Sequence, residues 1–384
     1  MSAVQEKCVT LASKHPVEPA RVEDDLTSLW RQAGDAAQKE GRGNVTRACL
    51  WNLVVYNPRP HKKFKDASGH GYGLRRLLDE VILSLPARIL RLEFAESKQV
   101  LPAGKDAMAW VAAKCLDAPG GKRQIHGEEI NLQVHGKSGD SHFPSLVRAL
   151  LQPSLPIALL GLDDLPHEGW MLEQLLNLCD RVLVDSQSNE YDCNLERIYE
   201  YQQSAPGHIV DIGWMRLTPV RYLLAGFFDS PHQAAQLKRI EHIAVEATPG
   251  GQNTALLLLG WLLSSCGFSR VSGSRAPGRK DSRRWQAGNG SRRFPVELRV
   301  RKGEGGVDGL IRITITAGGE QYTIRQVDAG HVSLDAPHRK DGKVDLNGWS
   351  DAELVIAGLG AQGIDPKFVE ALHCATALLR AKAR

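Results

Sequence analysis

The sequence predicts an α/β protein with a mixed or parallel sheet covered by helices, followed by a C-terminal α+β region that contains an antiparallel meander. From residue 141 onward, apolar strand segments and amphipathic helix segments alternate quickly, which favours a parallel or mixed sheet with helices on its faces. After residue 294, short alternating segments follow one another across glycine-containing turns, which is typical of a meander. The change of pattern predicts an N-terminal α/β domain over 1–207 and a C-terminal α+β domain over 208–384.

The composition is that of a globular protein. Of 384 residues, 42% are hydrophobic, which is enough for a sizeable core. The 48 lysines and arginines nearly balance the 44 aspartates and glutamates, so a net charge of +4 gives no overall attraction to nucleic acid. Residues 1–14 lack the apolar segment of a signal peptide, and the apolar run Ala255–Leu263 is far shorter than the ~20 residues that cross a bilayer. We therefore expect a soluble, cytoplasmic protein.

In the first half of the chain, apolar residues at helical spacing predict helices, and alternating or β-branched runs predict strands. Helices are expected at Val22–Ala37, 74–85, Phe143–Leu151, Glu168–Leu178 and Leu195–Gln202. Strands are expected at Thr46–Tyr56, Ile89–Phe94, Glu129–His135, Ile157–Leu162 and Arg181–Asp185. The basic stretch Arg59–Gly73 is expected to be a loop. The run Ile157–Leu162 does not alternate, as expected of a central strand that is buried on both faces.

In the second half, Ala255–Leu263 is hydrophobic on every side, which predicts a helix inside a large core. A further helix is expected from Pro219 to Phe228, and two more at the end of the chain. Strands are expected at Ile209–Ile212, Lys238–Val245, Pro295–Val300, Leu310–Thr316, Gln321–Gln326 and His331–Leu334. The stretch Val271–Arg293 is rich in Gly, Ser and Arg and is expected to be a mobile loop or a hairpin tip.

Seven cysteines are spread along the chain, and no two of them form a CxxC pair. Their odd number and wide spacing argue against a disulfide scaffold or a zinc ribbon. Cys49 and Cys179 stand in apolar surroundings, where a thiol behaves as a small buried hydrophobe in a reducing compartment. A redox pair stays open, because sequence separation does not give the distance between two sulfurs.

A GxGxxG match at Gly358–Gly363 is the dinucleotide fingerprint by sequence. Its context argues against that interpretation. Ser350 and Glu353 have the spacing of a capping box, so a helix should precede the glycines where the fingerprint requires a strand. We expect a helix-to-helix turn.

A helix start that contains Gly250, Gly251, Asn253 and Thr254 is a candidate anion-binding site, because exposed amides at a helix N-terminus can receive phosphate or carboxylate. The alternative is simple capping by Asn253 or Thr254, which the absence of a Walker lysine favours.

The arginine-rich stretch between Arg270 and Arg293 is a candidate site for nucleic acid or sugar phosphate, with Trp285 available to stack on a base. A solvated loop is the simpler interpretation, since one isolated basic patch on a nearly neutral chain is a weak electrostatic signal.

No catalytic or metal-binding motif emerges. The histidines His61, His70, His126, His135 and His142 form no set with the spacing of metal ligands. The acid pairs Asp163–Asp164 and Glu128–Glu129 could supply a base or Mg²⁺ ligands, but adjacent acids at turns are more often solvated. We expect no catalytic residues, no metal and no cofactor.

Five blocks read together resemble the glucose-6-phosphate dehydrogenase assembly protein family, OpcA. They are TRACLWNLVVYNP (Thr46–Pro58), HFPSLVRALLQPSLPIALL (His142–Leu160), CDRVLVDS (Cys179–Ser186), DIGWMRLTPVRYLLAGFFD (Asp211–Asp229) and ALLLLGWLLSSCGF (Ala255–Phe268). The resemblance implies a non-catalytic protein that binds glucose-6-phosphate dehydrogenase and promotes its assembly or allosteric activation. It implies neither a membrane nor a nucleic acid as partner.

The partner-binding candidates are Asp211, Trp214, Arg216 and Arg221, because tryptophan and arginine are common at interface hot spots. The alternative is that Trp214 belongs to the core and that the two arginines pair internally with Asp211 or Asp229.

Two other functions stay open. The main alternative is an α/β enzyme that acts on a phosphorylated metabolite and holds it at the helix start Gly250–Gly251 with nearby arginines. A related alternative is an accessory protein that binds a sugar phosphate weakly without converting it. A nucleic-acid binder that uses Arg270–Arg293 would show affinity that falls steeply with salt.

Overall fold

The structure is a computed structural model that describes residues 9–41, 45, 47–56, 72–95, 107–117, 124–135, 143–161, 170–187, 194–204, 209–268, 270–275, 282–289, 292–303, 309–328, 330–346 and 348–381. The chain divides into two compact units. The first holds residues 1–184 and 350–361, and the second holds 185–349 and 362–384. The chain passes from the first unit to the second after residue 184, and residues 350–361 belong to the first unit again. The single domain boundary expected near residue 207 stays a prediction.

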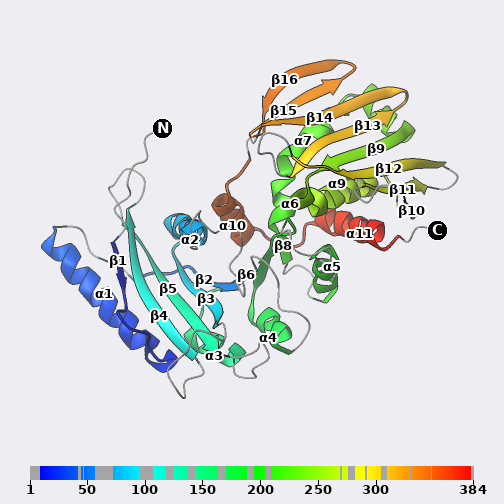
Figure 1. Ribbon diagram of the computed structural model, residues 1–384. Coiled ribbons are helices and arrows are strands. Elements are labelled where there is room, and N and C mark those ends of the chain that lie inside the picture. Colours follow the sequence, from blue (N-terminus) through cyan, green and yellow to red (C-terminus); the bar gives the residue numbers. More distant parts are fainter. Residues whose placement is uncertain are drawn as a thin grey trace. The chain divides into compact units, whose positions relative to one another are not determined.

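The first unit is built on a mixed sheet with the strand order β1-β4-β5-β3-β2-β6-β7 (Figure 1). Its strands are β1 Val9–Ala12, β2 Trp51–Tyr56, β3 Ala87–Ala95, β4 Ala107–Asp117, β5 Gln124–His135, β6 Ile157–Gly161 and β7 Arg181–Val184. Its helices are α1 Val22–Lys39, α2 Tyr72–Ser84, α3 Phe143–Leu150, α4 Trp170–Leu178 and α10 Asp351–Gly360, with the 3-10 turn η1 Pro19–Arg21. Neighbouring strands from β5 to β7 run parallel, whereas β4 runs antiparallel to both β1 and β5.

Burial follows the periodicity of the sequence. In β2 the consecutive residues Leu53, Val54 and Val55 are fully buried, as a strand in the middle of a helix-covered sheet requires. Helix α1 buries Leu26 and Trp30 among its core residues and leaves its charged positions toward solvent. The class predicted for this region, a mixed sheet covered by helices, is confirmed.

A buried ion pair joins two strands of this sheet. Arg88 on β3 and Glu128 on β5 are 1% and 0% exposed, and the Arg88 guanidinium contacts the Glu128 carboxylate at 2.7 Å. Trp30 Nε1 donates a hydrogen bond of 2.8 Å to the same carboxylate, and Arg47 also contacts it. The interpretation of Glu128–Glu129 as solvated acids is therefore wrong, because β5 carries both into the protein, where Glu129 is paired with Arg91 and Lys114.

The second unit contains a mixed sheet with the strand order β10-β11-β12-β9-β13-β14-β15-β16. These strands are β9 Ile240–Ala247, β10 Arg270–Arg275, β11 Ser282–Asn289, β12 Arg292–Val300, β13 Leu310–Ala317, β14 Glu320–Asp328, β15 His331–Ala336 and β16 Arg339–Asp345. The helices are α5 Asn194–Ser204, α6 Ile212–Arg216, α7 Thr218–Gly226, α8 Pro231–Gln236, α9 Gln252–Ser265 and α11 Pro366–Arg380. The short strand β8 Ile209–Asp211 and the 3-10 turns η3 Leu237–Arg239 and η4 Pro249–Gly251 complete the unit.

The meander is confirmed for β13, β14 and β15, which pair antiparallel in chain order, and β16, which was not expected from the sequence, extends it. Strand β12 is not part of it, because β9 lies between β12 and β13 and pairs parallel with β12. The stretch expected to be a loop or hairpin tip, 271–293, instead supplies β10, β11 and the start of β12. Two further strands, β1 and β4, were not expected from the sequence at all.

Helix α9 is the apolar core helix that the sequence predicts. Leu256, Leu257, Leu258 and Leu259 are all buried, so the helix is enclosed on every side. A Cβ built on Gly260 would lie 2.1 Å from the carbonyl oxygen of Ala371, so only glycine permits α9 and α11 to pack this closely. Among the residues that the structure describes, no helix combines the length and the apolar character needed to span a membrane.

Candidate functional site

The segment Asp211–Asp229 forms the end of β8 and the two consecutive helices α6 and α7. Asp211 begins α6 as its N-cap: its Oδ1 accepts hydrogen bonds from the backbone N–H of Gly213 at 3.0 Å and of Ser186 at 2.9 Å. Burial raises the pKa of this carboxyl to about 6, and the two backbone donors only partly oppose the shift. A Cβ on Gly213 would lie 2.2 Å from the Ser186 hydroxyl oxygen, so any larger residue here would force the Ser186 side chain to move.

Trp214 belongs to the core of the second unit, with 4% of its surface exposed. Its indole Nε1 donates a hydrogen bond of 2.7 Å to Asp365 Oδ2, and its ring lies 5.8 Å from the ring of Phe368. Asp365 Oδ1 also accepts from the backbone N–H of Lys367 and Phe368 and thereby caps α11. One carboxylate thus joins the start of α11 to α6, which fixes the position of the Trp214 ring.

Arg221 stacks on that ring. Its guanidinium carbon lies 3.6 Å from the Trp214 ring centroid, and its Nη2 donates a hydrogen bond of 2.9 Å to Thr218 Oγ1. Burial lowers the pKa of Arg221, and the nearby charge of Asp365 opposes this. Its Nε has no hydrogen-bond partner among the described residues. The side chain as a whole is half-buried.

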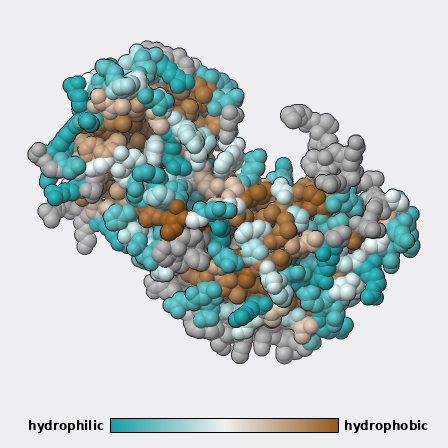
Figure 2. Space-filling model, turned by 180° about the vertical axis from the view of Figure 1, so that it is seen from behind, coloured by the Kyte–Doolittle hydropathy of each residue, from teal (hydrophilic) through white to brown (hydrophobic). Residues whose placement is uncertain are grey.

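Tyr222 follows directly and is 75% exposed, more than Leu50, Val327, Trp349 and Ile364, the other large exposed hydrophobic residues of the described chain. Figure 2 shows hydrophobic side chains gathered in several patches between hydrophilic ones, so a single exposed apolar residue is ordinary by itself. What distinguishes Tyr222 is its neighbour: an exposed aromatic ring and a stacked, half-buried guanidinium are adjacent on one helix.

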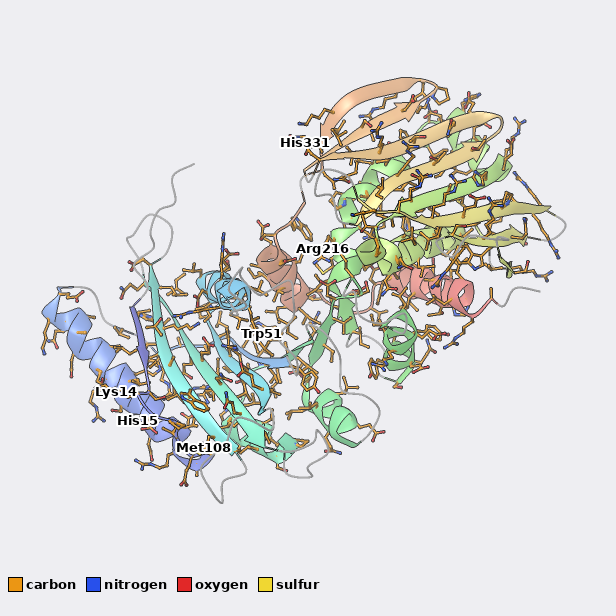
Figure 3. All side chains as sticks on the ribbon, viewed as in Figure 1. Lys14, His15, Trp51, Met108, Arg216 and His331 are labelled. Carbon is orange, nitrogen blue, oxygen red and sulfur yellow. The ribbon has the colours of Figure 1, made fainter. Side chains whose placement is uncertain are left out.

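Arg216, which Figure 3 labels at the end of α6, is held by a carboxylate and an amide. Its two terminal nitrogens donate to the two oxygens of Asp185, each at 3.1 Å, and Nη1 also donates to Gln187 Oε1 at 2.7 Å. This bidentate geometry fixes the guanidinium plane. The internal partner is therefore Asp185, and not Asp211 or Asp229.

The four partner-binding candidates therefore differ in how deeply their side chains are buried. Asp211 and Trp214 are buried and support the helices, while Arg216 and Arg221 are half-buried and reach the surface. The sequence interpretation missed Tyr222, although the helical spacing of the buried residues Val220 and Leu224 leaves that position facing outward. Asp365 was also missed, because its contact with Trp214 joins residues 151 positions apart.

The helix start at residues 250–254 differs from the capping expectation. Helix α9 begins at Gln252 with Gly251 as N-cap and no side-chain capping bond, so Asn253 and Thr254 lie inside the first turn and cap nothing. A Cβ on Gly251 would lie 2.4 Å from the carbonyl oxygen of Gly309, so backbone crowds the start of the helix. The anion site stays a prediction, and a carbonyl oxygen in this place does not favour it.

The arginine-rich stretch also differs from its sequence interpretation. Trp285 is 3% exposed and its Nε1 donates a hydrogen bond of 2.8 Å to the backbone oxygen of Leu378, so it cannot stack on a nucleobase. The reason is that β11 alternates, and its apolar positions face the helices. The match at Gly358–Gly363 begins in the last turn of helix α10 and runs into the turn before α11, as expected, and the capping box of Ser350 and Glu353 is present as predicted.

Among the described residues, no group of three or more His, Cys, Asp or Glu side chains could hold a metal ion. His61, His70, His142, the pair Asp163–Asp164 and the loop Arg59–Gly73 fall almost wholly outside the described residues. Cys49, Cys179, Cys266 and Cys374 are free thiols.

The fold is that of an α/β protein with two compact units. Its candidate functional site is the exposed Tyr222 beside Arg221, which stacks on the buried Trp214. Two family models match this chain, one after the other along the sequence. They are described as the N-terminal and the C-terminal domain of a glucose-6-phosphate dehydrogenase subunit. The model of the N-terminal domain matches residues 79–200, and the model of the C-terminal domain matches residues 207–372. Together these matches cover well over half of the chain. The chain belongs to the glucose-6-phosphate dehydrogenase assembly protein family, OpcA, as its sequence blocks predict.

Curated relatives are cyanobacterial proteins named "Putative OxPP cycle protein OpcA". The one from Nostoc punctiforme is 28% identical over 216 residues, which is 56% of this chain and 45% of that protein. The one from Synechocystis is 29% identical over 134 residues, 35% of this chain and 28% of that protein. The one from Synechococcus elongatus is 26% identical over 318 residues, 69% of this chain and 70% of that protein. The chain thus matches less than half the length of the first two relatives.

Solved structures with a related arrangement include a putative oxidoreductase from Thermotoga maritima, with a TM-score of 0.45, 11% identity and coverage of 86% of this chain and 96% of that one. Levoglucosan dehydrogenase has a TM-score of 0.44, 8% identity and coverage of 87% and 97%. A likeness at this level says nothing about the activity of this chain.

Proposed function

We propose that this protein is a non-catalytic accessory protein that binds glucose-6-phosphate dehydrogenase and promotes its assembly or allosteric activation in the oxidative pentose phosphate pathway. The observation that carries the proposal is the match, in chain order, to both domains of a family described as a glucose-6-phosphate dehydrogenase subunit. The names of the cyanobacterial relatives attach those proteins to the same pathway. A cytoplasmic location belongs to the proposal, and the free thiols of Cys49, Cys179, Cys266 and Cys374 suit a reducing compartment.

The contact surface in this proposal is the outward side of α6 and α7. Arg221 and Tyr222 make direct contact with the dehydrogenase, and Arg216 contributes at the edge of the surface. Trp214 and Asp211 act from below by holding the helices in place. A tyrosine ring buries a large area at a small cost in conformational entropy, and Arg221 is already held by its stacking on Trp214, so both side chains suit this role.

Activation requires a difference in affinity between two states of the partner. An accessory protein shifts the dehydrogenase toward its active form only if it binds that form better, by about 1–3 kcal/mol for useful coupling. The same surface therefore has to recognise a feature that the inactive form lacks or presents differently.

The test is an assay of glucose-6-phosphate dehydrogenase at varied glucose 6-phosphate, with and without this protein, together with co-elution of the two proteins in size-exclusion chromatography. We expect a complex and a higher rate at low substrate. An unchanged rate without a complex would contradict the proposal. Turnover of a sugar phosphate by this protein alone would instead support the alternative of an α/β enzyme.

A further inference from the structure

The sheet of the second unit has two chemically different faces. Pairing registers place Ile243, Val245, Ile313 and Ile315 on one face, where all four are buried and α9 packs against the sheet. We call the opposite face the outer face. Its central positions alternate with the buried ones, as the period of two residues requires, and they include Thr314, which pairs with Ala244.

The outer face carries an excess of arginine. The registers of β10 to β14 put six arginines on it, namely Arg270, Arg284, Arg293, Arg299, Arg312 and Arg325. The same registers put three carboxylates on it, those of Glu246, Glu297 and Asp335. Four of the arginines, Arg270, Arg284, Arg293 and Arg325, are exposed. Half of the set comes from the arginine-rich stretch of the sequence, so strand alternation turns that stretch into part of a charged surface.

Two of these carboxylates lie beneath the arginines. Glu297 contacts Arg284 at 2.9 Å and Arg299 at 2.5 Å, and its side chain is only 9% exposed. Glu246 contacts Arg299 at 3.6 Å and Arg301 at 3.3 Å, and its side chain is 8% exposed. The negative charge is thus covered, while the side chains of Arg284 and Arg301 remain 49% and 55% exposed. A ligand that approaches the outer face meets mainly guanidinium groups.

We propose that the outer face docks an acidic surface of a folded protein partner. The inference rests on the proposed function in taking glucose-6-phosphate dehydrogenase as that partner. Positive side chains gathered on one face of a sheet attract an acidic surface over several ångströms, which raises the association rate and selects the orientation of the encounter. The outer face then guides the encounter electrostatically, and the α6–α7 surface makes the close contact.

Two other occupants fit less well. A single-stranded nucleic acid needs aromatic rings for its bases, and the two aromatic side chains of β11 and β12, Trp285 and Phe294, are both buried on the inner side of the sheet. A second copy of this chain would bring one set of arginines against another, which like-charge repulsion opposes. An acidic protein surface meets neither obstacle.

The test compares two double charge reversals by kinetic binding to purified glucose-6-phosphate dehydrogenase. Arg293→Glu with Arg325→Glu reverses two exposed arginines of the outer face. Arg75→Glu with Arg148→Glu reverses two exposed arginines of the first unit, on α2 and α3, and is the matched control. At low salt we expect the outer-face variant to bind about 10-fold or more weakly than the wild type, mainly through slower association, and the difference to shrink above ~0.5 M salt. The control should bind within about 2-fold of the wild type.

Each other outcome overturns the proposal in a distinguishable way. If the wild type binds the dehydrogenase and the outer-face variant binds equally well, the docking surface is wrong and the proposed function stands. If the wild type does not bind at all, both fall. Tight, salt-sensitive binding of a 20-nucleotide single strand that the outer-face variant loses would show a nucleic-acid surface instead, and dimerisation of the wild type that the variant abolishes would show self-association.

Discussion

The guanidinium of Arg221 lies 3.6 Å above the ring of Trp214, and the same indole donates its N–H to Asp365 at 2.7 Å. A buried tryptophan is thereby placed between a half-buried cation and the anion that caps α11. The ring supports the arginine from below, and the hydrogen bond to Thr218 Oγ1 also holds the guanidinium in place. The most exposed large hydrophobic side chain of the described chain, Tyr222, stands next to it.

Replacing Tyr222 with alanine should weaken binding to glucose-6-phosphate dehydrogenase by about 1–3 kcal/mol, since truncation of a hot-spot aromatic typically costs this much. The ring is 75% exposed in the free protein, so the free energy of unfolding should change by less than about 0.5 kcal/mol. Calorimetric titration and thermal denaturation measure the two effects. Leu50→Ala, at a residue 54% exposed in the first unit, is the control and should leave the affinity unchanged. Equal affinity of wild type and Tyr222→Ala would remove α7 from the interface.

Asp211→Asn should stabilise the protein at neutral pH but not in acid. Burial raises the pKa of this carboxyl from 3.8 to about 6, so the folded state holds the proton more tightly than the unfolded state. The cost of ionising the group is absent below about pH 4, grows as the pH rises toward 6 and is fully present above it. Asparagine removes this cost and keeps an oxygen that can accept from Gly213 and Ser186. The variant should gain about 1–3 kcal/mol at pH 8 and nearly nothing at pH 4, as measured by urea denaturation.

Asp365→Ala should cost more than the loss of an ordinary helix cap. The carboxylate caps α11 and also accepts the N–H of Trp214, so its removal leaves a buried donor without a partner. We expect a loss of about 2–4 kcal/mol in the free energy of unfolding, with faster hydrogen exchange in α11. Ser350→Ala removes the cap of α10, where no second contact is involved, and should cost only about 1 kcal/mol. Equal losses in the two variants would show that the bond to Trp214 contributes little.

Glu128→Ala should destabilise the first unit by about 3–5 kcal/mol, because it leaves Arg88 buried and without its main counter-charge. Replacing both residues by apolar ones, Arg88→Met with Glu128→Leu, should cost less than Glu128→Ala alone, since no buried charge is then left unpaired. Denaturant unfolding of the two variants gives the comparison. A double variant that is less stable than the single one would show that the surrounding Trp30 and Arg47 depend on the pair.

The described cysteines should react slowly with alkylating reagents in the folded protein. Burial raises the pKa of Cys49 and of Cys179 to about 12 and that of Cys266 to about 11, which leaves very little thiolate at pH 8. Peptide-resolved mass spectrometry after iodoacetamide treatment should find these three thiols unmodified until denaturant is added. Rapid labelling of Cys266 in the native protein would reopen the idea of a thiol switch at that position.

Local sequence patterns predicted many elements, because their signals lie within one or two turns of chain. Helix α1 follows from apolar residues at helical spacing, and the cap of α10 follows from Ser350 and Glu353 three residues apart. The failures have a common cause. Strands β10 and β11 were expected to be a loop because arginine and glycine are poor core formers, yet pairing with β12 lets them form strands with only alternate residues buried.

The candidate site was found from the sequence only in outline. The types of residue in 211–221 suggested an interface, but their depth could not be known from composition. Trp214 is buried because helix α11, whose start lies some 150 residues later in the chain, supplies Asp365 and Phe368 against it.

Periodicity and motif spacing act over short distances, so the α/β class, the family, most of the helices and the central strands could be predicted from the chain alone. Three features could not be predicted in this way: the burial of Glu128 against Arg88, the outward position of Tyr222 beside a stacked Arg221, and the gathering of six scattered arginines on one face of a sheet. Burial and strand register depend on which distant segments pair. That pairing follows from the free energy of the whole packed core, and no single segment encodes it.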